Sequence, residues 1–464
     1  MLKLKLHILV FGLFLAYINV FALNKQIFID AVQPNPMQWN LMKVLKSDSN
    51  ITFYGDNFIG AWDLIRPLKI KPGQGVIVAV IDTGYTPHPN FKSNLQPLNP
   101  ESKPHEYKYG YQFIDDCRTA GRYPDGKPCP ANTAPNLTKI DPKPDALDIG
   151  NYLTASDISG SNGFFMGCAI KNSIWHGSGM ISTIADDGYI KGSPTQKLAG
   201  GAYGAKVVPI RIGGKCSRAP KFLEGLLYGL LWAVNKHPTI PNPHPAQVIH
   251  LSLDLPIDCK GWRSMNEVID KVNKAGAVII VASGNNSKDV SKSFPANCNK
   301  VISVSAKNSS NRLASYSSHG ATTITASGGE ISQNCVHYGC YMISSTWNSI
   351  QEFKLHDGHN TANTDGTSPA AAQVSAAVAN IASVLKLQGE DYDYKRIVDI
   401  LQKSADQFAP GGECYYDVRE KIKKCVPNRV LNVGNAIEMI LKKKVGYAFL
   451  GGNSPDMRYS SLVR

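Results

Sequence analysis

The chain has 464 residues, of which 43% are hydrophobic and only 18% are charged. This composition indicates a globular protein with a real core and excludes disordered, collagen-like and coiled-coil chains. Lys and Arg outnumber Asp and Glu by 49 to 36, and the resulting net charge of +13 favours anionic surfaces or partners. The 10 cysteines are too few for a small disulfide-built scaffold, so we expect disulfide bonds added to a folded core.

The N-terminus predicts export. Lys3 and Lys5 precede an apolar stretch over residues 8–20, and Ala22 supplies the small residue before a cleavage site. Residues 1–22 therefore have the pattern of a secretory signal peptide. An N-terminal membrane anchor is the alternative, but the stretch is shorter than the ~20 residues that span a bilayer. Without a later apolar run of that length, we predict a secreted protein, extracellular or periplasmic, with no membrane span.

After the signal peptide, we expect a short N-terminal segment at residues 23–60, one large domain at 61–442 and a polar C-terminal tail at 443–464. Continuous β-branched and aliphatic runs predict buried parallel strands at 76–81, 206–212, 247–253, 277–282 and 301–304. Apolar spacing of three and four predicts helices at 222–234 and 265–274, and an Ala-rich helix is expected at 370–385. This alternation indicates an α/β domain with a mostly parallel sheet.

Residues 92–174 form a long insertion rich in Gly, Pro, Asn and Asp, which predicts elaborated surface loops. The insertion carries acidic side chains whose oxygens are candidate ligands for a structural Ca²⁺, namely Asp115, Asp116, Asp141, Asp145 and Asp148. The alternative is that these side chains are only solvated.

Three polar residues stand beside predicted strands and helices. Asp82 ends the first strand, where open α/β sheets place their sites, although a turn-capping aspartate before Gly84 would look the same. His176 leads into a short apolar run, and Ser368 directly precedes the Ala-rich helix, where an N-cap serine is the alternative. Together they match a nucleophilic serine, which needs a histidine base and a carboxylate that orients this base.

Four motifs, taken in order, resemble the active-site segments of subtilisin-like serine proteases (subtilases). They are Asp82-Thr83-Gly84, His176-Gly177-Ser178, Ala282-Ser283-Gly284-Asn285 and Gly366-Thr367-Ser368. The order Asp, His, Ser is that of subtilases and differs from those of α/β-hydrolases and chymotrypsin-like enzymes. Residues 202–209, 294–298 and 314–317 are similar to secreted basic subtilases of Gram-negative bacteria.

The resemblance implies a three-layer subtilisin-like fold and a secreted serine endopeptidase that cleaves proteins through an acyl-enzyme. In this scheme Ser368 is the nucleophile, His176 is the general base and Asp82 orients His176. Asn285 would donate a hydrogen bond to the oxyanion. No cofactor is implied for the chemistry, protein or peptide substrates are the expected partners, and we expect a monomer.

The resemblance also assigns the two walls of the primary specificity pocket, where an extended peptide would pair. One wall is Ser252, Leu253 and Asp254; the other is Ala282, Ser283 and Gly284. The sequence departs from the family here, because Asp254 and Leu255 replace two glycines and His250 replaces an asparagine. We hypothesise that Asp254 favours a basic residue before the cleaved bond; the alternative is that it points to solvent.

Further departures concern processing and disulfides. The second histidine usual in the family motif is absent at Gly179, and the segment between Ala22 and Gln38 is too short for the folded propeptide of many relatives. Local spacing favours the pairs Cys117–Cys129, Cys335–Cys340 and Cys414–Cys425. The resemblance implies Cys216–Cys259, which leaves Cys168 and Cys298.

Two other functions remain open from the sequence. A pepsin-like aspartic protease would need two Asp-Thr-Gly carboxylates that share a proton, and the sequence has one. A catalytically silent relative, acting as a binding or host-interaction protein through residues 92–174, would retain the fold without the activity. No motif supports nucleic-acid binding, so we interpret the basic charge as a property of an exported basic protease.

Overall fold

The computed structural model describes residues 38–46, 52–114, 142–148, 150–151, 155–160, 170, 173–188, 198–214, 221–330, 343–348, 359–418 and 420–450. Its centre is an eight-stranded sheet with the order β10-β9-β8-β7-β3-β6-β4-β5. The strands are β3 (Ile77–Asp82), β4 (Tyr111–Gln112), β5 (Lys143–Pro144), β6 (Lys206–Arg211), β7 (Val248–Leu251), β8 (Val278–Ala282), β9 (Ile302–Lys307) and β10 (Ile324–Ser327). Every pair of neighbouring strands is parallel except the pair of β4 with β5.

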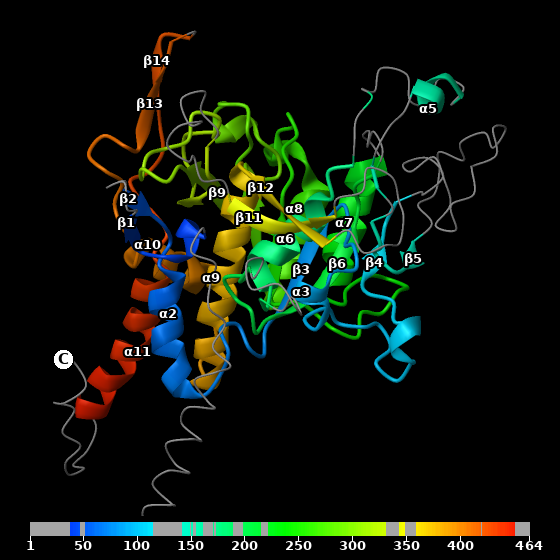
Figure 1. Cartoon of the computed structure of the whole chain (residues 1–464), viewed down its shortest axis with the longest axis horizontal. Coiled ribbons are helices and arrows are strands. Elements are labelled where there is room, and N and C mark those ends of the chain that lie inside the picture. The colour runs from blue at the N-terminus through cyan, green and yellow to red at the C-terminus, as the bar shows by residue number, and fades with distance from the viewer. Residues whose placement is uncertain are drawn as a thin grey trace, which may run out of the picture.

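Helices cover both faces of this sheet (Figure 1). One face packs against α2 (Phe58–Ile65), α6 (His176–Ala185), α9 (Thr367–Leu387), α10 (Tyr394–Lys403) and α11 (Val433–Leu450). The other face packs against α7 (Lys221–Ala233) and α8 (Arg263–Lys274). The predicted three-layer α/β fold is thus confirmed.

Helix α9 forms the centre of one helical layer. Among the described helices it alone is long and apolar enough to span a membrane, but 89% of its apolar window is buried inside the fold. It packs against α6, α11 and strands β7 to β10. Its alanines allow this close approach, because they add little volume between helix and sheet. The apolar composition of α9 is therefore that of a core helix.

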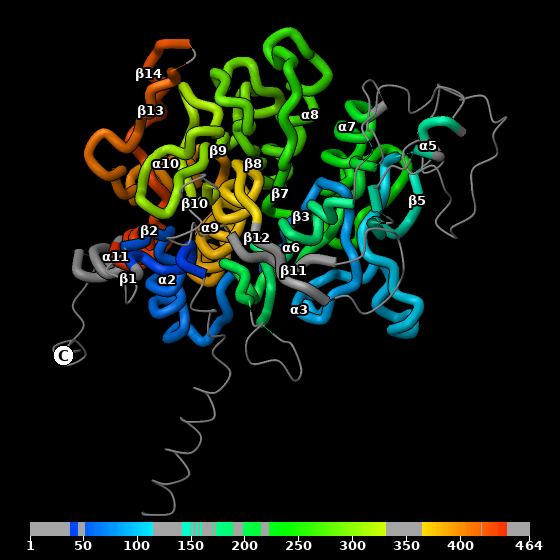
Figure 2. Tube along the Cα trace, turned by 45° about the horizontal axis from the view of Figure 1, so that its top comes forward, coloured from blue at the N-terminus to red at the C-terminus, as the bar shows by residue number. Residues whose placement is uncertain are grey.

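The remaining elements lie around this core. They are α3 (Pro89–Lys92), α5 (Ala155–Gly160) and three antiparallel pairs: β1 (Val44–Lys46) with β2 (Thr52–Tyr54), β11 (Ile343–Asn348) with β12 (His359–Thr364), and β13 (Cys414–Asp417) with β14 (Ile422–Cys425). Figures 1 and 2 show the β13–β14 hairpin projecting from the body, and α2 beside α9 and α11.

All five predicted strands and all three predicted helices are present, with small differences at their ends. Strand β7 stops at Leu251, earlier than expected, and the chain then leaves the sheet toward Leu255. Strand β9 continues to Lys307, three residues further than predicted. Helix α11 reaches Leu450 and so includes the first part of the segment that we expected as a tail.

The described disulfides confirm one predicted pair and correct another. Cys414 bonds to Cys425 across the β13–β14 hairpin, as the spacing predicts. Cys259 bonds to Cys298, so the pairing of Cys259 with Cys216 is wrong. The reason is local: Leu255 and Phe294 exchange backbone hydrogen bonds of 2.9 and 2.8 Å, which places the two cysteine segments side by side. The other cysteines lie outside the described residues.

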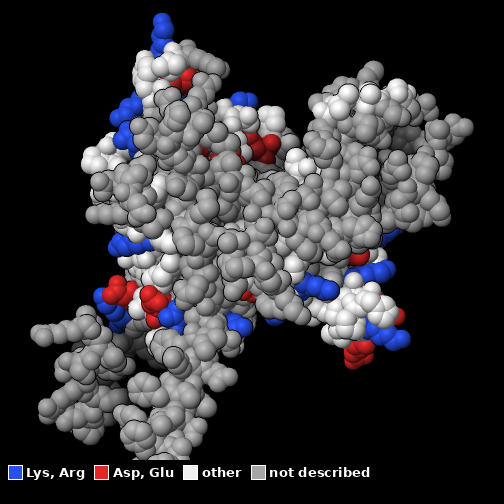
Figure 3. All heavy atoms as spheres, viewed as in Figure 1, with Lys and Arg blue, Asp and Glu red and all other residues white. Residues whose placement is uncertain are grey.

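Charged side chains of both signs are spread over the face shown in Figure 3. Several Lys and Arg side chains follow the edge near the β13–β14 hairpin, whose sequence contains Lys421, Lys423 and Lys424. Lys424 is itself neutralised by Asp417 and Glu420, at 2.8 and 3.0 Å. Among the described residues of this face, basic and acidic side chains thus lie near one another.

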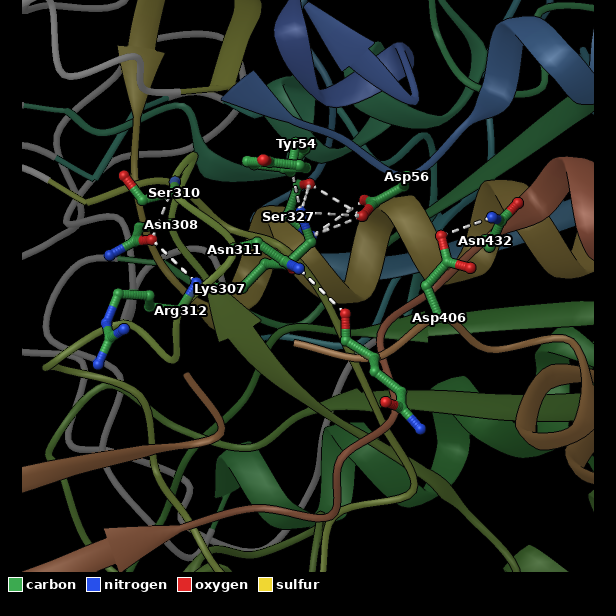
Figure 4. Close-up of polar contacts among 11 residues, drawn as sticks. Tyr54, Asp56, Lys307, Asn308, Ser310, Asn311, Arg312, Ser327, Asp406 and Asn432 are labelled. Atoms are coloured by element: carbon green, nitrogen blue, oxygen red, sulfur yellow. Dashed lines mark hydrogen bonds and ion pairs between the residues drawn. The ribbon is translucent and has the colours of Figure 1, made fainter. Parts of the chain in front are cut away.

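A buried ion pair joins the N-terminal segment to the sheet (Figure 4). Lys307 Nζ lies 3.6 Å from Asp56 Oδ1, and both side chains are fully buried. Asp56 accepts hydrogen bonds from the backbone N–H and hydroxyl of Ser327, and Lys307 donates to the carbonyl of Tyr54. Lys307 also lies 5.4 Å from the ring centroid of Trp39. Trp39, Tyr54 and Asp56 are thus attached to strands β9 and β10.

Replacing Lys307 by methionine is expected to lower the free energy of unfolding by about 3–5 kcal/mol, because it leaves the Asp56 carboxyl buried without its cation. Urea unfolding followed by circular dichroism measures this loss. The double variant Asp56→Asn, Lys307→Met should lose less than the sum of the two single changes, since it removes both charges. A loss below ~1 kcal/mol for Lys307→Met would show that the pair has no structural role.

Candidate active site

Asp82 and His176 meet at the carboxyl end of the central strand β3. His176 Nδ1 lies 2.7 Å from Asp82 Oδ2 and 2.9 Å from Asp82 Oδ1. The Asp82 side chain is 4% exposed and that of His176 is 24% exposed, so the imidazole covers the carboxylate and presents its other edge outward. Thr83 N donates to Asp82 Oδ1 at 2.6 Å and holds the carboxylate in place. This pair has the geometry of a carboxylate that orients a histidine base.

The glycines beside Asp82 and His176 allow their two segments to come into close backbone contact. Gly84 has φ +101°, a conformation that favours glycine, and a Cβ on Gly177 would lie 2.1 Å from Gly84 O. Thr83 joins the motifs further, because its hydroxyl accepts a hydrogen bond from Gly177 N at 3.0 Å. The same hydroxyl donates to Asp148 Oδ2 at 2.7 Å. Helix α6 therefore begins at a fixed position beside β3.

The electrostatic environment raises the pKa of His176. Burial lowers this pKa, but the charge and hydrogen bond of Asp82 and the charge of Asp148 together raise it above the ordinary histidine value. Asp148 is fully buried, and burial raises its own pKa to about 6. Asp148 is thus mostly ionised at neutral pH and acts as a second negative group behind the pair.

Replacing Asp148 by asparagine is expected to move the acid limb of the pH–rate profile to lower pH. The base must be unprotonated to act, and removing one nearby negative charge lowers the pKa of His176. The measurement is kcat/KM for a peptide substrate between pH 5 and pH 9. An acid limb that stays in place, or moves to higher pH, contradicts this assignment. Asp187→Asn is a suitable control, since Asp187 contacts Ser93 at the surface.

Ser368 is the second residue of α9, and Gly366 is the N-cap with φ +143°. Helices α6 and α9 pack together, and Ser368 is buried, with 9% of the residue exposed. Within the described part of the chain, no hydrogen bond joins the Ser368 hydroxyl to His176. Such contacts are often long without substrate. The structure thus places Ser368 at the amino end of a long helix, where the helix dipole favours negative charge.

Asn285 follows β8 and is held by the motif that contains Ser368. Its Oδ1 accepts hydrogen bonds from Thr367 N and Thr367 Oγ1, both at 2.8 Å. Since the carbonyl end is engaged in this way, the NH₂ end remains available to donate, and the residue is exposed. Thr367 Oγ1 also accepts from Gly284 N at 3.1 Å. One threonine therefore fixes both the candidate oxyanion donor and the wall beside it.

His250, which departs from the family pattern, lies buried between β7 and α9. Its Nε2 is 2.7 Å from Ser252 Oγ, and its Nδ1 is 3.2 Å from Ser375 Oγ. Burial lowers the pKa of His250 to about 4, so it is neutral at physiological pH. The side chain bridges the strand that carries one pocket wall and the helix that carries Ser368. It is a structural link, and no local pattern in the sequence predicts its partners.

The two predicted pocket walls lie next to each other because β7 and β8 are neighbouring strands. Ser252, Leu253 and Asp254 make no backbone–backbone hydrogen bond with another described residue, which leaves this edge open to an added strand. On the facing wall, Ala282 and Ser283 are buried and Gly284 O accepts from Ser318 N at 2.8 Å. The structure thus brings all six residues to one region.

The described candidates for calcium do not fit a shared metal site. Asp145 Oδ1 accepts from the Tyr85 hydroxyl at 2.8 Å, and Asp148 is engaged by Thr83 and by Gly150 N at 2.9 Å. The described residues contain no group of three or more acidic, His or Cys side chains that could hold a metal ion. Asp115, Asp116 and Asp141 lie outside the described residues.

Sequence reasoning missed the positions that hold these groups together. Thr83 and Thr367 stand inside the motifs, so their position is a signal that their hydroxyls hold the candidate site residues in place. Asp148 was weighed only as a calcium ligand, because nothing in the spacing of the long insertion connects it to Thr83. Its place behind the Asp82–His176 pair emerges only from the folded chain.

The chain is similar in sequence to two bacterial extracellular proteases. The sequence is 30% identical over 341 residues to the extracellular basic protease of Dichelobacter nodosus, covering 72% of this chain and 47% of that protein. It is 34% identical over 268 residues to an extracellular protease of Xanthomonas campestris pv. campestris, covering 57% of this chain and 38% of that protein. The chain thus spans less than half the length of these relatives.

Solved structures show the same fold. A protease of Pseudoalteromonas arctica superposes with a TM-score of 0.63 at 26% identity, covering 88% of this chain and 99% of that one. The epidermin leader peptide processing serine protease of Staphylococcus aureus has a TM-score of 0.53 at 16% identity, covering 87% and 81%, which is a likeness of fold alone. Residues 73–412 match the subtilase family. This match extends over most of the chain, which therefore belongs to the subtilase family.

Proposed function

We propose that the chain is an exported serine endopeptidase with Asp82, His176 and Ser368 as its triad and Asn285 as an oxyanion donor. The observation that carries the proposal is the buried Asp82 carboxylate hydrogen-bonded to His176 Nδ1. A carboxylate in this position keeps the proton on Nδ1 and leaves Nε2 as the base. The family match and the names of the relatives support the same activity.

In this mechanism Ser368 Oγ bonds to the carbonyl carbon of the scissile peptide while its proton passes to His176 Nε2. The negative charge that develops on the carbonyl oxygen is stabilised by Asn285 Nδ2 and by the N–H of Ser368 at the start of α9. His176 then gives its proton to the leaving amine as the C–N bond breaks. Water completes the cycle by attacking the acyl-enzyme with His176 again as base.

The expected substrates are proteins or peptides bound in an extended conformation along the open edge at Ser252, Leu253 and Asp254. Residues 1–22 and the extracellular relatives support export. A basic exported protein would favour anionic surfaces or substrates through long-range attraction, which weakens as salt increases.

A fluorophosphonate probe tests the proposal directly, because it reacts with a serine that has been activated by a base. The purified protein is treated with the probe before and after heat denaturation, and the adduct is located by peptide mass spectrometry. Labelling of Ser368 in the native sample alone, together with digestion of casein, is the expected result. No labelling and no digestion would favour the silent, binding-only relative.

A further inference from the structure

A carboxylate lies between the two predicted walls of the specificity pocket. A Cβ built on Gly284 would lie 2.5 Å from Asp254 Oδ2 and 2.7 Å from Asp254 Cγ. The carboxylate therefore rests directly against the bare Cα of Gly284, on the opposite wall. Gly284 has φ +106° and carries no side chain to push the carboxylate away. Asp254 thus reaches toward the opposite wall, and its carboxylate stays partly exposed there.

Hydrogen bonds and packing hold Asp254 in this position. Asn286 Nδ2 donates to Asp254 Oδ2 at 2.9 Å. The next residue, Leu255, exchanges backbone hydrogen bonds with Phe294, and Leu253 packs against the core on that side of the sheet. The disulfide Cys259–Cys298 closes the same pair of segments. The loop that carries Asp254 is therefore held in place by hydrogen bonds, packing and a disulfide bond.

The negative charge of Asp254 has no matching cation in the described part of the chain. Its hydrogen-bond partner there is the neutral amide of Asn286, and none of the ion pairs among the described residues includes it. Asp254 is only partly buried, so water solvates it when the site is empty. A substrate side chain that enters between the walls would displace this water. Only a cationic side chain would compensate the carboxylate.

We propose that Asp254 is a specificity-determining residue that selects Lys or Arg before the cleaved bond. The inference rests on the proposed protease function and names its substrate class. The long apolar stem of Lys or Arg would lie between the walls, with its charged end at Asp254. An apolar side chain of similar length would leave the carboxylate desolvated and unpaired.

The test uses peptides that differ only in the residue before the cleaved bond, namely Lys, Arg, Leu, Phe and Ala. The purified enzyme is assayed unlabelled, and a separate aliquot is titrated with the fluorophosphonate to count active sites, because the adduct blocks Ser368. We expect kcat/KM for Lys and Arg to exceed that for Leu by about 10–100-fold, the range of one compensated buried charge. Asp254→Asn should remove this preference, so that kcat/KM for Lys and Arg falls toward that for Leu. Asp258→Asn, an exposed aspartate of the same loop, is the matched control and should retain the preference.

Two results would overturn the inference while the protease function stands. One is a preference that is unchanged in Asp254→Asn, in enzyme whose active sites are shown by the probe titration to be reactive. The other is a preference for Ala in the parent that gives way to faster cleavage after Leu and Phe in Asp254→Gly, which would mean that the carboxylate only blocks the pocket. A protein that neither reacts with the probe nor cleaves any peptide refutes the proposed function, and this inference with it.

Discussion

Replacing Ser368 by alanine is expected to lower kcat for a peptide substrate by about 10⁶-fold, the size of effect known for the nucleophile of a subtilisin. The Oγ atom forms the covalent bond of the acyl-enzyme, and no neighbouring group in the described structure can take over this step. The binding residues and Asn285 would remain, so KM should change much less than kcat. Single-turnover and steady-state assays on one purified peptide separate the two parameters.

The Ser368→Ala variant should affect little besides the proposed nucleophile. It removes a single oxygen at the end of α9, and the structure shows no hydrogen bond of that oxygen to His176. Ser383→Ala on the same helix is the matched control, because Ser383 Oγ donates to Gln74 O at 2.6 Å, far along α9 from the candidate site. The control should keep parent activity. Residual activity of Ser368→Ala within tenfold of the parent would exclude this serine as the nucleophile.

The sequence could predict the core of the fold because that core has strong and simple patterns. Strands β3, β6, β7, β8 and β9 are buried on both faces and therefore appear as continuous apolar runs. Helix α9 is buried as well, and its many alanines let it pack closely against the sheet. Weak elements such as β10, with the sequence Ile324–Ser327, carry no such pattern and take their place only by pairing with β9.

The candidate site could be predicted only as far as its motifs extend. Asp82 and His176 are joined by a hydrogen bond, and Asn285 is joined to the threonine beside Ser368. The supports from Asp148 and His250 come from contacts between segments far apart in sequence, which no local pattern encodes. The error over Cys259 has the same origin, since its partner is chosen by the pairing of Leu255 with Phe294.

Replacing Asp82 by asparagine is expected to lower kcat by about 10⁴-fold with a small change in KM. The amide would keep the shape of the carboxylate, and its oxygen could still accept from Thr83 N. Its NH₂ group, however, would face His176 Nδ1 and favour the tautomer with the proton on Nε2. That tautomer cannot take the proton of Ser368, so the loss falls on the chemical step.

The pH profile distinguishes this explanation from a general loss of structure. The charge and hydrogen bond of Asp82 raise the pKa of His176, so Asp82→Asn should also move the acid limb to lower pH. Asp270→Asn, which breaks the exposed ion pair with Lys300, is the control and should leave kcat and the acid limb unchanged. If Asp82→Asn retains kcat within tenfold of the parent, Asp82 does not orient the catalytic base. A loss of kcat together with the shifted limb would assign the orienting role to Asp82, because misfolded protein lowers the amount of active enzyme without changing the pKa of the base that remains.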